Sequence, residues 1–226
     1  MSASVPMVFT SGFQDLGAFA GRPEDVKVEP MFFNSSVAFA MANGGVITRA
    51  FLSALPAGWE DAVFDSRVHM LMPGWYPAIP GFHHDDVPRP PIPVGQHFAT
   101  AAQPDYDTPR YHAEHILGLV NGDICPTAFA VGIARMPAVP EGDLIYRTWD
   151  AEVRAQIERG ELSRVLCPSN RLIAFDCNAF HEASKATGNG WRWFGRVSRN
   201  TDRQKTITNE FRTQVQVYLE FPMEGW

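Results

Sequence analysis

The sequence predicts a mainly β protein in which short antiparallel strands form a sandwich, jelly roll or barrel, supported by a few helices. Hydrophobic residues make up 45% of the 226 residues and aromatic residues 12%, enough to bury a substantial core. Eighteen prolines and eighteen glycines favour many short elements joined by turns. Short runs rich in valine, isoleucine, leucine and phenylalanine recur between turn residues, which is typical of strands.

The first 64 residues are predicted to form a supporting region with at least one helix. Turn residues are frequent before Glu29, so we expect an irregular or short-strand start. After Gly44-Gly45, apolar residues recur at helical spacing over residues 47–55, and Pro56 ends that helix. Residues 37–41 fit either a strand or one face of a helix.

Residues 65–199 are predicted to form the core and residues 200–226 a C-terminal strand extension, all within one domain. A second helix is expected over residues 148–159, with Gly160 at its end. Six prolines predict a long surface loop over residues 87–109. The predicted strands are residues 65–72, 112–120, 128–135, 171–177, 191–199 and 213–221.

Charge and composition exclude several classes of protein. The net charge of −6 lacks the basic excess of a protein whose main task is to coat nucleic acid. The sequence has neither an apolar run of roughly 18 residues nor the pattern of a signal peptide, so we expect a cytoplasmic protein with no membrane partner. Three cysteines without a Cys-x-x-Cys pair predict free thiols in a reducing compartment.

The string His83-His84-Asp85-Asp86, directly after Phe82, carries the first candidate metal ligands. Residues two apart on a strand point to the same face. Either of the two overlapping His-x-Asp pairs, 83 with 85 or 84 with 86, can therefore place an imidazole beside a carboxylate. The residues alone leave both pairs open.

A third ligand is offered by His181, which follows the buried strand predicted over residues 171–177. Two histidines and one carboxylate on one face of divalent iron leave coordination positions open for a co-substrate and dioxygen. The pattern therefore predicts an Fe(II) site that needs no other redox cofactor.

Three features together resemble the iron(II)- and 2-oxoglutarate-dependent oxygenases, in particular the phytanoyl-CoA hydroxylase and prolyl hydroxylase branches. They are the His-x-Asp pair, the run Arg171–Asp176 followed by His-Glu-Ala, and an arginine 11 to 15 residues after the second histidine. The resemblance covers roughly residues 68–199. It implies a double-stranded β-helix, Fe(II) held by His83, Asp85 and His181, and 2-oxoglutarate and dioxygen as co-substrates. It also implies hydroxylation of a C–H bond, with succinate and CO2 as co-products.

In this family a cation on the strand after the second histidine binds the distal carboxylate of 2-oxoglutarate. On the strand predicted over residues 191–199, alternate residues from Arg192 to Ser198 share one face. By its spacing Arg192 is the favoured anchor. Arg196, which forms Arg-x-Ser with Ser198, is the alternative and would lie nearer the metal. Tyr76 is a further candidate, whose hydroxyl could bind the co-substrate.

The sequence carries no motif that names the substrate. A small molecule is favoured, a protein side chain comes second and a nucleobase third. Basic residues on and after the 191–199 strand, beside aromatic ones, are the feature that fits a nucleic acid. A cupin-like metal enzyme would need more histidines, and a non-catalytic jelly-roll binding module would be expected to lose a ligand. The oligomeric state is left open.

Overall fold

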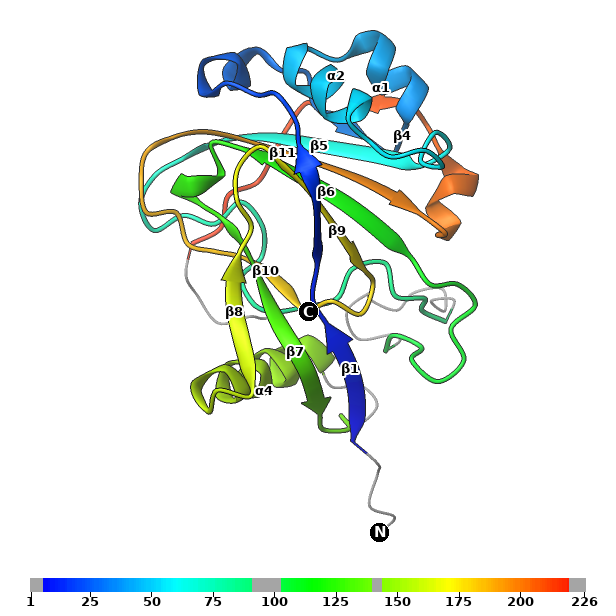
Figure 1. Cartoon of the computed structure of the whole chain (residues 1–226), viewed down its shortest axis with the longest axis vertical. Coiled ribbons are helices and arrows are strands. Elements are labelled where there is room, and N and C mark those ends of the chain that lie inside the picture. The colour runs from blue at the N-terminus through cyan, green and yellow to red at the C-terminus, as the bar shows by residue number, and fades with distance from the viewer. Residues whose placement is uncertain (1–5, 91–102, 140–143, 220–226) are drawn as a thin grey trace.

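Two antiparallel β-sheets face each other in the computed structural model, which describes residues 6–90, 103–139 and 144–219 (Figure 1). The larger sheet has the order β2 (Gln14–Ala18), β9 (Arg171–Asp176), β6 (Glu114–Val120), β11 (Gly190–Arg199), β5 (Val63–Leu71) and β4 (Ser35–Ser36). In the smaller sheet β7 (Thr127–Met136) pairs with β1 (Met7–Ser11), β8 (Leu162–Leu166) and β10 (His181–Ala183). A separate short pair joins β3 (Phe32–Phe33) to β12 (Glu210–Phe211).

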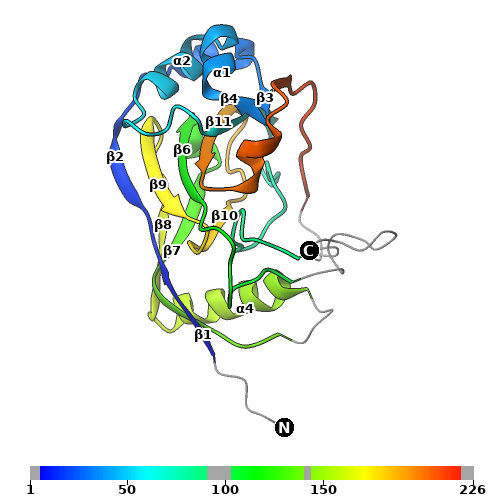
Figure 2. The ribbon, with the colours of Figure 1, turned by 90° about the vertical axis from the view of Figure 1, so that its right-hand side faces the viewer.

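The chain passes repeatedly from one sheet to the other. After β6 in the larger sheet come β7 and β8 in the smaller one, then β9, β10 and β11 alternate between the two. This winding of antiparallel strands between two facing sheets is the jelly roll, or double-stranded β-helix, so the predicted fold class is confirmed. The N-terminal strands add to it, because β1 lies on the edge of β7 and β2 on the edge of β9 (Figure 2).

Helices cover the outer faces of both sheets. The helices α1 (Val37–Asn43) and α2 (Val46–Ser53) lie over the larger sheet, and α4 (Ile145–Glu158) lies along the smaller one (Figures 1 and 2). Three 3-10 turns complete the described elements: η1 (Pro23–Val28), η2 (Gly122–Ile124) and η3 (Asp202–Thr206). No helix in the described ranges is long and apolar enough to span a bilayer.

The strand β6 shows why the larger sheet is fixed between two apolar layers. Ile116 and Val120 pack in the cluster shared with the helices, which also contains Phe51. Leu117 and Leu119, on the opposite face, pack against the smaller sheet. A strand that is buried on both faces reads as a continuous apolar run, which is the pattern of this segment. The three cysteines, all buried, are free.

Most predicted elements agree with the structure to within three residues, but one predicted strand is wrong and several short strands and 3-10 helices were not predicted. Residues 37–41 form a helix, because Ser36 caps it by accepting a hydrogen bond from the Phe39 amide at 3.2 Å. The predicted strand over 213–221 is wrong for its described part, residues 213–219, which contains only an isolated bridge from Tyr218 to Tyr76. Its apolar residues alternate, but several are exposed because no sheet face receives them.

The proline-rich segment over 87–109 forms neither helix nor strand in its described parts, residues 87–90 and 103–109. The rest of that predicted loop lies outside the described residues. Strand β8, which the sequence did not indicate, pairs along the whole of its length with β7. Four of its five residues are partly or fully exposed, so the apolar signal used for prediction is weak there.

Candidate metal centre

His83 and His181 form a cross-strand pair at the edge of the smaller sheet. The backbone amide of each donates a hydrogen bond to the carbonyl oxygen of the other, at 3.1 and 3.2 Å. On the His83 side this is an isolated bridge, because the residues around His83 are not part of a strand. Residues directly opposite each other on antiparallel strands project their side chains to the same face. The two imidazole ring centroids are accordingly 4.7 Å apart.

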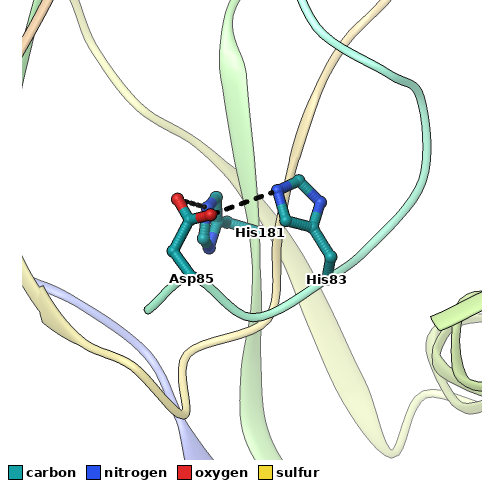
Figure 3. A group of neighbouring side chains, drawn as sticks. All are labelled: His83, Asp85 and His181. Atoms are coloured by element: carbon teal, nitrogen blue, oxygen red, sulfur yellow. Dashed lines mark hydrogen bonds and ion pairs between the residues drawn. The ribbon is translucent and has the colours of Figure 1, made fainter. Parts of the chain in front are cut away.

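Asp85 completes the group from two residues further along the chain (Figure 3). Its Oδ2 is 3.1 Å from Nε2 of His181, and its Oδ1 is 3.8 Å from Nε2 of His83. One ligand atom from each of the three residues lies within 4.8 Å of the others. Asp86, next in the chain, has a positive φ of 51°, so the backbone turns sharply directly after the carboxylate.

Backbone carbonyl groups orient both rings. Nδ1 of His83 is 2.8 Å from the carbonyl oxygen of Gly81, and Nδ1 of His181 is 2.9 Å from that of Ala179. A carbonyl oxygen can only accept, so each Nδ1 carries the hydrogen and each Nε2 faces the carboxylate. Burial lowers the pKa of His83 to about 4, with the nearby charge of His181 as a further cause, so this imidazole is neutral at pH 7.

Arg196 on β11 is the counter-ion of Asp85, which its Nη1 contacts directly. Burial alone would raise the pKa of Asp85, but the positive charge of Arg196, with smaller contributions from the two neighbouring histidines, holds it well below its usual range. Asp85 is therefore an ionised acceptor inside a largely buried site. Its second oxygen faces His83 rather than the guanidinium.

The donor set fits a divalent transition metal. Two neutral imidazole nitrogens and one carboxylate are the facial set of non-haem iron(II) proteins. Ligands about 2.1 Å from a common ion lie roughly 3 to 4 Å apart, close to the separations here. The carbonyl groups behind each ring supply the outer hydrogen bonds that metal-binding histidines normally have. His83 and His181 are only 8% and 7% exposed.

The overlapping pair, His84 and Asp86, is directed elsewhere. His84 stacks on Phe180 with a centroid distance of 3.8 Å, and its Nδ1 is 2.9 Å from the hydroxyl of Tyr106. Asp86 faces Arg203, at 3.6 Å. Of the two arrangements that the sequence left open, the one with His83 and Asp85 is brought together with His181.

The three residues open onto a cavity of about 380 Å³, in the range of roughly 300–1,000 Å³ that is usual for small-molecule sites. Its walls come from β5, β11, the segment before His83 and the C-terminal segment. The other described lining residues are Phe33, Asp65, Arg67, His69, Pro77, Ala78, Ile79, Asp86, Thr127, Ala183, Arg192, Phe194, Arg196, Arg203, Arg212 and Tyr218.

Arg192 and Arg196 both line this cavity, with Phe194 between them, as the shared strand face predicts. Arg192 is 2% exposed, and its Nη2 donates to the hydroxyl of Thr127 at 3.3 Å. Its Nε has no hydrogen-bond partner in the described part of the chain. Burial lowers its pKa, and no carboxylate of the described residues pairs with it.

Ser198 and Tyr76, the other two candidates for co-substrate binding, are not among the described residues that line the cavity. The hydroxyl of Ser198 is 2.9 Å from Nδ1 of the buried His115. Tyr76 forms the bridge to Tyr218 through its backbone, and the ammonium of Lys185 lies 5.9 Å from its ring centroid.

The basic residues on and after β11 do not form one exposed face. Three of them, at 192, 196 and 203, line the cavity. Arg199 pairs with Glu114 and lies over Trp59, Arg203 pairs with Asp65, and Lys205 pairs with Asp202.

Sequence reasoning missed the cavity residues on β5. Asp65, Arg67 and His69 alternate along a segment that was predicted as a strand, so they share a face. That alternation was the signal in the sequence from which these cavity residues could have been found. Thr127 and Arg212 lie far from the motifs in sequence, and only the pairing of the strands brings them to the site.

No protein-family model matches the chain, and no curated protein matches its sequence. Among solved structures, the crystal structure of HygX from Streptomyces hygroscopicus with iron bound is similar to this chain. The TM-score is 0.41 and the sequence identity 12%, over 84% of this chain and 82% of that chain.

Proposed function

We propose that the protein is an iron(II)- and 2-oxoglutarate-dependent oxygenase that hydroxylates a C–H bond of a small molecule. His83, Asp85 and His181 would hold the metal, and Arg192 would bind the distal carboxylate of 2-oxoglutarate. Iron(II) and 2-oxoglutarate, when bound, supply the oxidising chemistry with dioxygen, and succinate and CO2 are the co-products.

The observation that carries the proposal is the buried guanidinium of Arg192 in the same cavity as the His-Asp-His group. A buried cation without an anionic partner is costly, and an arginine stays protonated at any ordinary pH. A carboxylate bound to its planar fork would relieve that cost with two parallel hydrogen bonds. Thr127 would supply a further hydroxyl to the same carboxylate.

The remaining side chains would bind and orient. Arg196 holds the Asp85 carboxylate in place and balances its charge, while the carbonyl groups of Gly81 and Ala179 fix the two imidazoles. Phe194, on β11 between the two arginines, presents an apolar surface to the same space. Apolar walls exclude water from the reacting group, which protects an oxidant from side reactions.

The test is anaerobic addition of Fe(II) and then 2-oxoglutarate, followed by visible absorbance. We expect a metal-to-ligand band that requires both additions and saturates at one equivalent of each. In Arg192→Gln the band should require about a hundredfold more 2-oxoglutarate, because the carboxylate loses its partner. Arg147→Gln is the matched control, since Arg147 is exposed on α4. A colourless parent protein would overturn the proposal and favour a cupin-like enzyme or a non-catalytic module.

A further inference from the structure

The cavity carries more positive than negative side chains. Its described lining contains five arginines and three aspartates, which leaves an excess of two positive charges from these residue types. His69, on the same wall, adds no charge at neutral pH, because burial and the nearby Arg192 lower its pKa to about 3. Iron(II) and 2-oxoglutarate carry opposite charges of two, so together they would leave this excess unchanged.

All three aspartates already have arginine partners. Arg196 contacts Asp85, and Arg203 contacts Asp65 and lies 3.6 Å from Asp86. Arg192 is the residue assigned above to the co-substrate.

Arg67 and Arg212 are the two remaining arginines of the cavity lining. In the described ranges no ion pair joins either guanidinium to a carboxylate, although the charges of Asp65 and Asp85 act on Arg67 from further away. Nε of Arg212 is buried and has no hydrogen-bond partner in those ranges. Burial lowers the pKa of Arg67, and the positive charges of Arg212 and Arg196 lower it further. Two like charges therefore face one cavity, and neither has an ion-pair partner among the described residues.

Apolar side chains surround these two cations. The guanidinium of Arg212 lies over the ring of Phe33, 4.7 Å from its centroid. Arg67 is opposite Phe194 in the register of β5 and β11, so that ring lies on the same sheet face between Arg192 and Arg196. Pro77, a further apolar residue of the lining, adds to the same wall.

We propose that the primary substrate is a small organic anion whose carboxylate or phosphate group is bound by Arg67 and Arg212, with its apolar part against Phe33 and Phe194. This inference rests on the proposed function, because it assigns the second half of the same cavity. The planar fork of arginine suits both anionic groups. A ligand held there would lie in the same cavity as the metal ligands, beside the co-substrate site.

The test is calorimetric binding to the full chain loaded with Zn²⁺ and 2-oxoglutarate, which needs no turnover. Three probes of similar shape are used: benzoate, phenyl phosphate and the uncharged benzamide. We expect at least one anion to bind and benzamide not to bind. Comparison of benzoate with phenyl phosphate identifies the preferred anionic group.

The variants are Arg67→Gln and Arg212→Gln, with Arg147→Gln as the control for loss of one arginine. Each cavity variant should weaken binding of the preferred anion at least tenfold and leave 2-oxoglutarate binding within about twofold of the parent. Neither should lower the thermal midpoint, because neither breaks an ion pair. Arg67→Lys keeps the charge without the fork, and we expect it to weaken binding less than Arg67→Gln does.

Three outcomes would overturn the inference. Benzamide binding as tightly as benzoate would show that charge plays no part. Normal 2-oxoglutarate binding with no anion binding, or with anion binding that both variants retain, would reject the inference and leave the proposed oxygenase intact. Anion binding without any 2-oxoglutarate binding in the parent would reject the oxygenase, and with it the assignment of this site to a primary substrate.

Discussion

The carboxylate of Asp85 lies beside two imidazoles and a guanidinium, and these neighbours give it a different pKa from that of the aspartate next to it. Both carboxylates are largely buried, but only at Asp85 do the surrounding groups outweigh the effect of burial on the pKa. The pKa of Asp85 lies well below its usual range, whereas burial raises that of Asp86. The carboxylate whose ionised form its surroundings favour more strongly is therefore the one that faces both histidines.

The first prediction concerns the metal ligands. His83→Ala, Asp85→Ala and His181→Ala should each weaken Zn²⁺ or Fe(II) binding by more than a hundredfold, because each removes one of three donors. Asp86→Asn removes a charge from the same cavity without removing a donor, so its affinity should stay within about tenfold of the parent. Calorimetric titration of the metal-free proteins measures this. Loss of binding in Asp86→Asn but not in Asp85→Ala would move the site by one residue.

The second prediction separates Arg192 from Arg196. Removal of Arg192 should raise the apparent 2-oxoglutarate constant about a hundredfold, because a buried carboxylate would be left unpaired. Arg196→Ala should act less on that constant and more on metal affinity, because Arg196 contacts Asp85. Succinate release over a range of 2-oxoglutarate concentrations distinguishes the two. If both variants resemble the parent, neither arginine is the anchor.

At the scale of elements, α2 depends on a carboxylate from outside the helix. Oε1 of Glu29 accepts from the Ile47 amide at 2.7 Å, and Oε2 accepts from the amide and the hydroxyl of Thr48 at 3.3 and 2.8 Å. These amides have no partner within the helix, and a negative charge is favourable at a helix N-terminus. Glu29 is 6% exposed, so the interaction is little screened by water.

The third prediction is that Glu29→Ala lowers the free energy of unfolding by roughly 1 to 3 kcal/mol, through the lost cap and the unsatisfied buried groups. Urea unfolding followed by circular dichroism gives the value. Glu24→Ala serves as the control, because Glu24 lies in the exposed first turn of η1. Equal stability of the two variants would show that the Glu29 contacts contribute nothing measurable.

Elements with a strong apolar pattern could be predicted from the sequence. Short strands that exist only because a neighbouring strand pairs with them could not. Strand β6 is a largely apolar run, and β11 carries apolar and polar residues between clear turn signals, so both were found with nearly correct bounds. Strand β10 has three residues and exists because β7 pairs with it. Residues 213–219, the described part of the predicted C-terminal strand, alternate like a strand, but their backbone forms only the isolated bridge to Tyr76.

The residues of the candidate site also fall into two groups, those that a local sequence pattern indicates and those that only the fold brings together. His83, Asp85 and His181 could be selected because their spacing and their strand context are both local signals. Which His-x-Asp pair faces His181 depends on the backbone bridge between residues 83 and 181, a contact across 98 residues that no local pattern encodes. The arginine at 212 reaches the cavity only through the pairing of β12 with β3.

At the scale of the whole molecule, the fold buries several histidines in their neutral form. Burial lowers the pKa of His69 to about 3 and that of His83 to about 4, and it holds those of His84 and His115 well below their usual range. In the unfolded chain each would titrate near 6.5. Below that pH the unfolded state binds more protons than the folded state, so the free energy of unfolding falls as the pH falls.

The last prediction tests this with one histidine that is not a candidate metal ligand. Nε2 of His69 is 3.2 Å from the carbonyl oxygen of Gln216, and His69→Gln keeps a donor there without a titrating group. The part of the free energy of unfolding that depends on neutral His69 is fully present above about pH 6.5. It is lost progressively as the pH falls towards 3, at roughly 1.4 kcal/mol per pH unit. Urea unfolding in EDTA between pH 7.5 and 4.5 should therefore show a slope against pH about 1 kcal/mol per unit shallower in His69→Gln than in the parent. His112→Gln, whose parent side chain is 51% exposed, is the control for the loss of a surface histidine. Parallel lines for all three proteins would mean that His69 titrates normally in the folded state, and its burial against Arg192 would not have the expected electrostatic effect.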